Sequence, residues 1–270
     1  MSMIPYAFSY RRPKSLAEAE AFFAASPESS FLAGGQTLIP TMKMRLAMPP
    51  ELIDISGLAD LKFIRAEAGQ IVIGAGVKHA DVATALEVRK AIPALAELAG
   101  MIGDPAVRHM GTLGGSIANN DPASDYPGAL VGLGATVKTT RAEYAADEFF
   151  TGMFSTALAD GEIVTSVSFP VPKIAAYAKF PNPASRYAMA GVFVAMFAEG
   201  VRVAVTGAGS CVFRVPAMEK ALAVSFAPAA VAGISVSPED LNSDIHASAE
   251  YRAHLVGVMA GRAVATALSR

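Results

Sequence analysis

Residues 31–46 read FLAGGQTLIPTMKMRL, a stretch in which two adjacent glycines separate a short apolar run from a helical pattern. After the glycines, Leu38, Met42 and Leu46 recur at helical spacing, which predicts one helix over residues 36–47. The first N–H groups of a helix lack partners and carry a positive partial charge. A diphosphate group therefore fits this loop without any Lys or Arg, and the glycines let it approach the backbone closely.

A second glycine-rich segment, residues 110–130, reads MGTLGGSIANNDPASDYPGAL. Gly114 and Gly115 stand between Thr112 and Ser116, and a polar run with two asparagines and two aspartates follows them. Either segment alone is compatible with an ordinary turn. Two such segments about 80 residues apart predict a pair of loops that hold one diphosphate from both sides.

Two further glycine-containing segments are predicted to be tight turns. Residues 71–81, IVIGAGVKHAD, match the first half of the dinucleotide-binding pattern GxGxxG, but His79 occupies the third glycine position. No acidic residue ends a second strand about 20 residues later, as a nicotinamide site would require. Residues 203–213, VAVTGAGSCVF, also lack the third glycine of the pattern, and they lie in a predicted hairpin rather than between a strand and a helix. These departures disfavour a nicotinamide-binding Rossmann domain.

Composition and charge narrow the functional class. The chain has 270 residues, with 22 Lys or Arg, 24 Asp or Glu and a formal net charge of −2, which disfavours nucleic-acid binding. Hydrophobic residues make up 53% and charged residues 17%, which excludes disorder and suggests that partner chains cover part of the surface. The longest charge-free stretch, residues 221–238, is interrupted by Pro228 and Gly233, so no membrane span is predicted. With no signal peptide visible, we expect a cytoplasmic protein.

Cysteine and histidine usage predicts no metal site in this chain. Cys211 is the single cysteine, too few for an iron–sulfur cluster, and it is interpreted as a small buried residue. The four histidines, His79, His109, His246 and His254, show no close metal-ligand spacing. Any redox metal that works with this chain is therefore expected in another chain.

The pattern predicts alternating helices and strands up to about residue 172 and an antiparallel hairpin beyond it. Ser15 and Glu18 form a capping box that opens a helix over residues 16–26. The other predicted helices are 81–90, 93–102 and 249–268, and the predicted strands are 53–55, 71–75, 163–169, 187–197 and 201–206; residues 30–33 are a short apolar stretch before the glycines. Clustered prolines place a boundary near residue 172, between an α/β part and an α+β part; they are Pro170, Pro172, Pro181 and Pro183.

The two glycine segments, AGGQTLIPTMKMRLAMPPELIDIS (33–56) and GTLGGSIANNDPASDYPGAL (111–130), resemble the FAD-binding medium subunits of molybdenum-containing hydroxylases. That family includes carbon monoxide dehydrogenase, xanthine dehydrogenase and aldehyde oxidoreductases. The likeness extends to FSYRRPKSLAEA (8–19), GEIVTSVSFPVP (161–172), KFPNPASRYAMAGVFVA (179–195) and LNSDIHASAEYRAHL (241–255). It thus covers almost the whole chain.

The resemblance implies an α+β fold of the vanillyl-alcohol-oxidase type. An FAD-binding domain is expected over residues 1–172, built from two α/β subdomains of about 1–57 and 58–172. A C-terminal α+β domain, with an antiparallel sheet and a small helical bundle, is expected over residues 173–270.

The resemblance also implies roles for individual residues. The loop 31–38 is expected to wrap the FAD pyrophosphate, residues 112–116 to close over it, and Asp125 to bind the ribose or adenine end. Ile102 and Val164 are expected to line the flavin, with Lys179 near its ring and Tyr187 beside the isoalloxazine. Ser116 replaces the Asn of some relatives, a swap that leaves the backbone contact intact. The full predicted set is Phe31, Leu32, Ala33, Gly34, Gly35, Gln36, Thr37, Leu38, Ile102, Gly111, Thr112, Gly114, Gly115, Ser116, Asn119, Asp121, Asp125, Val164, Lys179 and Tyr187.

Several of these residues have a purely structural alternative. Asp121 precedes a proline and could simply form a turn. Tyr187 could belong to the core, and Lys179 could be a solvated charge at a strand end. His79 and His109 are interpreted as structural residues rather than covalent attachment points for FAD. No catalytic acid, base or nucleophile is expected in this chain.

By the same resemblance, a large partner subunit oxidises substrate at a molybdenum cofactor. Electrons then pass through 2Fe–2S clusters of a small partner subunit to FAD on this chain, and on to an external acceptor. A dimer of heterotrimers is the family expectation. The alternatives are a free-standing FAD-dependent oxidoreductase of the same wider fold and a scaffold that has lost the cofactor. The sequence leaves the substrate and the terminal acceptor open.

Overall fold

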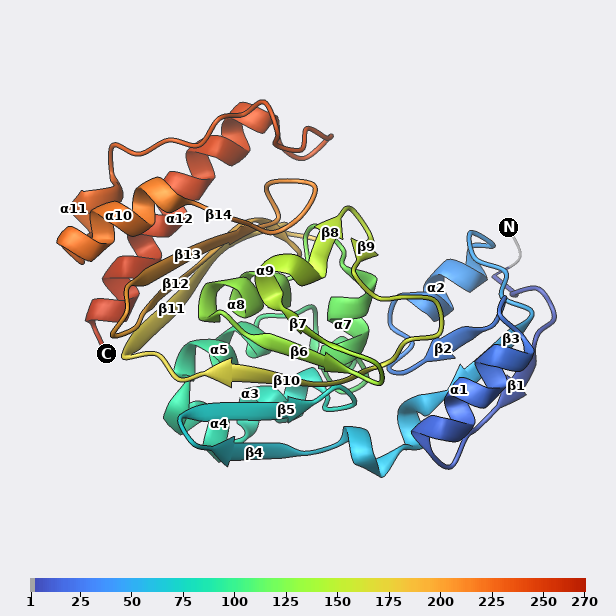
Figure 1. Cartoon of the computed structure of the whole chain (residues 1–270). Helices are drawn as coiled ribbons and strands as arrows, with labels where there is room; N and C mark the ends of the chain where they lie inside the picture. Colours follow the sequence, from blue (N-terminus) through green and yellow to red (C-terminus); the bar gives the residue numbers. More distant parts are fainter. Residues whose placement is uncertain (1–2) are drawn as a thin grey trace.

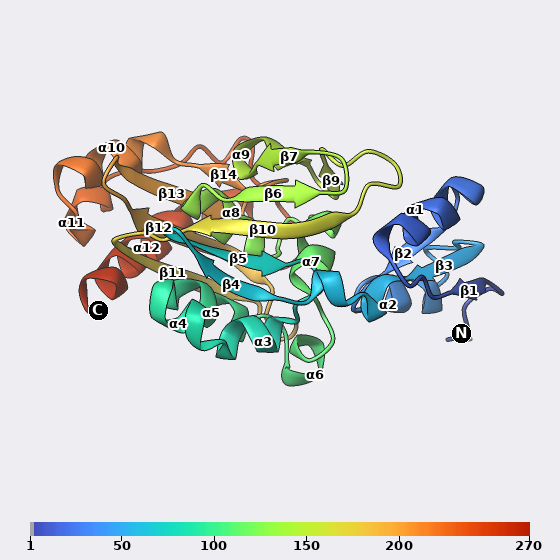
Figure 2. The ribbon, with the colours of Figure 1, turned by 60° about the horizontal axis from the view of Figure 1, so that its bottom comes forward.

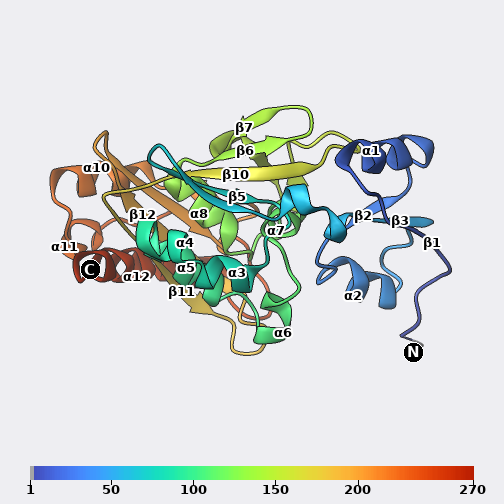
Figure 3. The same cartoon turned by 90° about the horizontal axis from the view of Figure 1, so that it is seen from below.

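The computed structural model describes residues 3–270, which form three main β-sheets with helices between and around them (Figure 1). The first sheet is parallel and has three strands in the order β1-β3-β2, namely Ser9–Arg11, Glu51–Asp54 and Ser30–Leu32. Helices α1 (Leu16–Ala25) and α2 (Leu38–Lys43) lie on opposite sides of this sheet (Figure 3). The Ser15 side chain accepts a hydrogen bond from the Glu18 N–H, as the predicted capping box requires.

The second sheet has five strands, all paired antiparallel, in the order β4-β5-β10-β6-β7. Their bounds are Ile64–Glu67, Gln70–Gly74, Val164–Pro170, Thr136–Thr139 and Glu143–Ala145. Two short 3-10 helices, η1 (Ile55–Gly57) and η2 (Ala59–Leu61), lead into it from the first sheet. Helices alternate with strands here as the sequence predicts, but only the first sheet is parallel.

The third sheet is antiparallel, in the order β11-β12-β13-β14, with bounds Ile174–Pro181, Ala188–Met196, Val201–Thr206 and Phe213–Arg214. The long helix α12 (Ala249–Leu268) packs on it, α11 (Pro228–Val231) packs against α12, and α10 (Pro216–Val224) packs on β13. The predicted hairpin is β12–β13, closed where the Phe197 N–H donates to the Gly200 carbonyl.

A helical layer separates the second sheet from the third (Figures 1 and 2). It contains α3 (His79–Thr84), α4 (Leu86–Ala91), α5 (Pro93–Gly100), α6 (Pro105–Arg108), α7 (Leu113–Asn119), α8 (Tyr126–Leu133) and α9 (Ala146–Phe149). A small hairpin, β8 (Phe150–Gly152) with β9 (Ser155–Thr156), follows α9. Every residue of α8 is buried, because the helix packs against β12 and β13 inside the core.

Two predicted helices and the predicted places of two residues, Tyr187 and Cys211, are wrong. The helix predicted over 36–47 is only α2, because Arg45 adopts a left-handed φ of 60°; Leu46 is consequently 72% exposed. The helix predicted over 81–90 is interrupted at Ala85, whose ψ of 128° ends α3 before α4 begins. Tyr187 lies just outside strand β12, and Cys211 is partly exposed rather than buried.

No helix within residues 3–270 is long and apolar enough to cross a membrane.

Candidate functional site

The structure brings the two glycine loops into contact. A Cβ atom on Gly34 would lie 2.3 Å from the Met110 carbonyl oxygen and 2.8 Å from the Gly111 Cα. Only glycine fits at position 34, because the obstacle is backbone that cannot move aside. Gly115 faces the same junction, with the Ala33 Cβ 3.9 Å from where its own Cβ would stand.

The first loop presents a run of free N–H groups. It leaves β2 after Leu32, turns at Gly35 with a left-handed φ of 70°, and enters α2 at Leu38. Within the described residues 3–270, none of the five backbone N–H groups of residues 33–37 donates a hydrogen bond. Gln36 and Thr37 are exposed, so this turn is open to a ligand from solvent. Consecutive free N–H groups in a tight turn form an anion-binding concavity.

The second loop is built differently, because its N–H groups already have acceptors. Leu113 N–H donates to the Val77 carbonyl, and Gly114 N–H donates to the Ala75 carbonyl, at 3.0 and 2.8 Å. Gly115 N–H donates to the Thr112 side chain, the N-cap of α7, at 3.1 Å. This loop is therefore a fixed wall opposite the first loop, and Gly115 keeps that wall free of a side chain.

His79 fixes the second loop from beneath. The backbone N–H of His79 donates to the Gly111 carbonyl at 3.0 Å, and a Cβ on Gly111 would lie 2.6 Å from the His79 Nε2. The imidazole is 4% exposed, lies against the Tyr126 ring at 5.4 Å, and its Nδ1 has no partner among the described residues. Burial, with a smaller contribution from Arg108, lowers the pKa of His79 to about 4. His109 is exposed, with Nδ1 2.7 Å from the Pro105 carbonyl oxygen.

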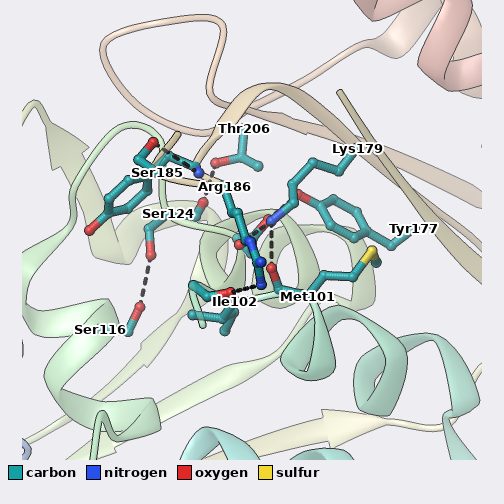
Figure 4. Close-up of polar contacts among 12 residues, drawn as sticks. Met101, Ile102, Ser116, Ser124, Tyr177, Lys179, Ser185, Arg186 and Thr206 are labelled. Carbon is teal, nitrogen blue, oxygen red and sulfur yellow. Dashed lines mark hydrogen bonds and ion pairs between the residues drawn. The ribbon is translucent and has the colours of Figure 1, made fainter. Parts of the chain in front are cut away.

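The polar run after α7 is anchored to the third sheet. Ser116 Oγ lies 2.8 Å from Ser124 Oγ, and the Thr206 hydroxyl donates to the Ser124 carbonyl at 2.6 Å (Figure 4). Asp121 accepts from the Ala123 N–H at 2.9 Å, which is the turn-forming bond that the sequence left open for it. Asn119 ends α7 and is partly exposed.

Sequence reasoning missed Asn120, which fixes the far side of the second loop. Its φ is 42°, and its Nδ2 donates to the carbonyls of Gly152 and Ser155 at 2.8 and 2.7 Å. The same Nδ2 lies 3.8 Å from the Sγ of Cys211. Asn is one of the few residues that tolerate a left-handed conformation, and this is the signal that could have indicated Asn120.

Asp125 and Lys179, two predicted site residues, form a buried ion pair, and the Tyr177 hydroxyl donates a hydrogen bond to Asp125 (Figure 4). Asp125 is 3% exposed; its Oδ1 accepts from the Tyr177 hydroxyl at 2.6 Å and its Oδ2 from Lys179 Nζ at 3.0 Å. Burial raises the pKa of the Asp125 carboxyl, and the Lys179 ammonium opposes that shift. The sequence did not indicate Tyr177, although Tyr177 and Lys179 are two residues apart in strand β11 and therefore share a face.

Three cationic side chains bind successive carbonyls at the C-terminal end of α5. Lys179 donates to the Met101 carbonyl at 3.0 Å, and Arg108 donates to the Ile102 carbonyl at 2.9 Å. Arg186 donates to the Gly103 carbonyl at 3.4 Å (Figure 4). Met101 is the C-cap of α5, and a carbonyl at a helix end lacks an internal partner and carries a negative partial charge, so the Lys179 ammonium stabilises it. Ile102 and Gly103 lie just beyond the helix. The predicted flavin neighbours Ile102 and Lys179 are thus adjacent.

Two other predicted flavin neighbours, Val164 and Tyr187, do not take part in the contacts around Ile102 and Lys179. Val164 is 5% exposed and belongs to the hydrophobic core of the second sheet. Tyr187 is 46% exposed and lines a cavity of about 280 Å³ together with Asp121 and Phe154. Burial, and then the Asp121 carboxylate, raises the pKa of Tyr187.

A protein-family model described as "FAD binding domain in molybdopterin dehydrogenase" matches residues 6–172. The chain belongs to this family. It is 35% identical to the carbon monoxide dehydrogenase medium chain of Afipia carboxidovorans, with 99% of each chain covered. It is 34% identical to the nicotine 6-hydroxylase medium subunit of Paenarthrobacter nicotinovorans, with 98% of each covered.

Solved structures agree with this assignment. Reconstituted CO dehydrogenase from Oligotropha carboxidovorans matches with a TM-score of 0.89 and 33% identity over 99% of each chain. Quinoline 2-oxidoreductase from Pseudomonas putida 86 matches with a TM-score of 0.88 and 29% identity over 98% of each chain. The predicted family, its FAD-binding fold and FAD as the cofactor are confirmed.

Within residues 3–270, no group of three His, Cys, Asp or Glu side chains could hold a metal ion.

Proposed function

We propose that this chain is the FAD-carrying electron-transfer subunit of a molybdenum hydroxylase complex. A large partner subunit would hold the molybdenum cofactor and a small partner subunit the 2Fe–2S clusters, in a dimer of heterotrimers in the cytoplasm. Similarity over nearly the whole length to medium chains of carbon monoxide dehydrogenase and nicotine 6-hydroxylase supports this role. When bound, the flavin supplies the redox chemistry, and the protein binds and orients it.

The observation that carries the proposal is the run of five N–H groups at residues 33–37 that have no acceptor in the described part of the chain, opposite the wall at Gly115. FAD has a diphosphate that needs hydrogen-bond donors, and this loop offers them without a cationic side chain. The left-handed φ of 70° at Gly35 sets the tight turn of this loop, a conformation that glycine adopts readily. The residues present therefore fit FAD.

The family resemblance gives the remaining residues their proposed roles. By that resemblance we assign Ile102 and Lys179 to the flavin ring end, and Asp125 and the Met101 carbonyl hold Lys179 in place. Asp125 lies 3.0 Å from Lys179 Nζ, so it belongs to the same end of the site as Lys179, and both of its carboxylate oxygens already accept hydrogen bonds within the chain. The predicted contact of Asp125 with the adenosine half stays a prediction that competes with this placement of Lys179. Contacts of Val164, Tyr187, Asp121 and Asn119 with the cofactor also stay predictions.

We also propose the domain division predicted from the sequence, with an FAD-binding domain over 1–172 and a C-terminal domain over 173–270. The distribution of the sheets supports it. The first sheet lies within residues 9–54, the second within 64–170 and the third within 174–214. A subdomain division near residue 57 falls between the first two.

Gly115→Val tests the proposal. Gly115 is exposed on α7. A Cβ there would lie 3.9 Å from the Ala33 methyl and 2.9 Å from the Thr112 Oγ1, so the Thr112 hydroxyl must shift to make room. We expect the variant to fold and to bind FAD at least about tenfold more weakly, as measured by titration and by flavin content after purification. Gly35→Val should have the same effect, with added strain from its φ of 70°.

The matched control is Gly261→Val, also in a helix, where a Cβ would meet nothing within 4 Å. Full FAD occupancy in both Gly115→Val and Gly35→Val would contradict the proposed site. Copurification from the native host tests the subunit role. FAD together with two partner chains supports it, whereas FAD with rapid turnover and no partners would indicate a free-standing oxidoreductase.

A further inference from the structure

A short antiparallel contact holds the second glycine loop against the start of α3. Lys78 pairs with Thr112 in an isolated β-bridge. Beside that bridge, the backbone N–H of His79 donates to the Gly111 carbonyl at 3.0 Å. Residues 78 and 79 therefore fix the backbone of the loop at Gly111 and Thr112.

The imidazole of His79 packs directly on Gly111. A Cβ atom added to Gly111 would lie 2.6 Å from the imidazole Nε2 and 2.9 Å from its Cδ2. Atoms at these distances overlap, so the ring fills the space in which any other residue at position 111 would place its side chain. The backbone of the second loop consequently rests on the ring.

Gly111 also contacts the first glycine loop. A Cβ on Gly34 would lie 2.8 Å from the Gly111 Cα and 2.3 Å from the Met110 carbonyl oxygen. Gly111 is thus packed against the His79 ring and against the backbone of the first loop. Because protein interiors are close-packed, a shift of Gly111 is not absorbed by empty space and changes the separation of the two loops.

The imidazole acts here as a packing group and not as a charge or a ligand. It is 4% exposed, the Tyr126 ring lies against it at 5.4 Å, and its Nδ1 has no partner among residues 3–270. Burial, and then the Arg108 guanidinium, lowers its pKa to about 4, so the ring is neutral at pH 7. Because the ring is buried beneath the loop, any effect of His79 on a cofactor passes through the loop backbone.

We propose that His79 is a positioning residue for FAD, whose imidazole sets the position of Gly111 and thereby the separation of the two glycine loops. This inference rests on the proposed function, because it assumes that FAD binds between those loops. Recognition of a diphosphate by backbone N–H groups depends on their spacing, because N–H···O hydrogen bonds form within a narrow range of distances. The size of the side chain at position 79 therefore controls the affinity for FAD.

An exchange of size between positions 79 and 111 tests the inference in the full chain. His79→Ala leaves a void beneath the loop, and Gly111→Ala forces a methyl group into the ring. Each is expected to raise the Kd for FAD at least about tenfold, measured by flavin fluorescence titration at pH 7. In the double variant the methyl group enters the space that the ring leaves, so the Kd should return to within about threefold of the wild type. The φ of Gly111 is not left-handed, so its backbone accepts alanine.

Leu222→Ala is the matched control for loss of stability alone. Leu222 is 1% exposed and belongs to the hydrophobic core between the third sheet and α12. Its truncation should lower the melting temperature but leave the Kd for FAD within about twofold of the wild type. Each Kd is measured at a temperature at which circular dichroism shows the variant to be folded. His79→Gln, which keeps a planar group beneath Gly111, should bind FAD more weakly than the wild type and more tightly than His79→Ala.

Three outcomes would overturn the inference, and the third also removes the proposed function. If His79→Ala lowers the melting temperature but keeps the wild-type Kd for FAD, the ring only stabilises the fold. If the double variant binds FAD no better than Gly111→Ala, the size of the ring does not set the separation of the loops. In both cases a wild type that binds FAD and a Gly115→Val variant that does not would leave the proposed site intact. A wild-type chain that binds no FAD would remove that site itself.

Discussion

At the scale of single residues, the glycines of the two loops serve different purposes. Gly34 and Gly114 allow close backbone packing, since their Cβ atoms would lie 2.3 Å from the Met110 oxygen and 2.5 Å from the Ala75 Cβ. Gly35 permits a left-handed turn, and Gly115 leaves the space between the loops open. The sequence indicates that these glycines matter, but it does not show which neighbour each one meets.

His79 should make the stability of the protein depend on pH. Its pKa is lowered to about 4 in the folded state, against about 6.5 when unfolded. Between those values the unfolded chain binds a proton that the folded chain does not, so the free energy of unfolding falls as the pH falls from 6.5 to 4. The loss from this group is roughly 3 kcal/mol at the acid end, and none above pH 6.5.

Urea unfolding of the wild type and of His79→Gln at pH 7 and pH 4.5 measures this contribution. We expect His79→Gln to lose less stability over that interval than the wild type. His254→Gln is the control, because His254 is exposed on α12. A pH dependence that is identical in all three proteins would show that His79 does not couple folding to acid.

At the scale of elements, the Asp125–Lys179 pair ties the start of α8 to strand β11. Both side chains are buried, so removing one partner leaves an uncompensated charge in the core. We expect Asp125→Ala to destabilise the protein by about 3 to 5 kcal/mol and Lys179→Met by a similar amount. The double variant should lose less than the sum of the two, because it leaves no unpaired charge.

Urea unfolding of the two single variants and the double variant gives the coupling energy. Lys173→Met, at an exposed lysine just before β11, is the control and should change stability by about 0.5 kcal/mol or less. Strict additivity of the two single effects would mean that the pair does not join the two elements.

The elements differ in how well the sequence predicts them. Helices α1 and α12 were predicted within a residue, because Ser15 and Ser248 cap them and no break occurs inside. Strand β11 was not predicted, since its stretch IAAYAKFP has three helix-favouring alanines and a lysine, and only its pairing with β12 makes it a strand. The break at Ala85 has no Gly or Pro to announce it.

The functional site was likewise predicted only in part. Local motifs predicted that both glycine loops matter, and the structure places those loops together. The partners of Asp125 could not be predicted from sequence, because Tyr177 and Lys179 lie 52 and 54 residues away and meet it only through the packing of α8 on the third sheet. The difference between the donor-rich first loop and the closed second loop likewise depends on Ala75 and Val77, which lie in the segment 71–81 that the sequence indicates only as a tight turn.

At the scale of the whole molecule, the first sheet lies at one end and meets the rest through loops (Figures 1 and 2). Gly34 lies on Met110, and the Phe23 ring of α1 lies against Gly161. A cofactor held by residues 33–37 and by the wall at Gly115 would fasten this end to the remainder. We therefore expect FAD to stabilise the first sheet more than the third.

Hydrogen–deuterium exchange with and without FAD checks this expectation. Amides of β1–β3 and α1 should exchange at least about tenfold more slowly with FAD bound, while those of β11–β13 change less. In Gly115→Val the same addition of FAD should have no effect. Protection confined to the third sheet would contradict the proposed position of the cofactor.

Cys211 gives the molecule one further property, because it is the only thiol in the chain and is partly exposed. Its Sγ lies 3.8 Å from the amide of Asn120, which fixes the second loop from behind. A fluorescent or spin label attached to the wild-type protein would therefore occupy a single known position, with no cysteine to remove first. A label there would follow changes in the second loop without a background signal from another cysteine.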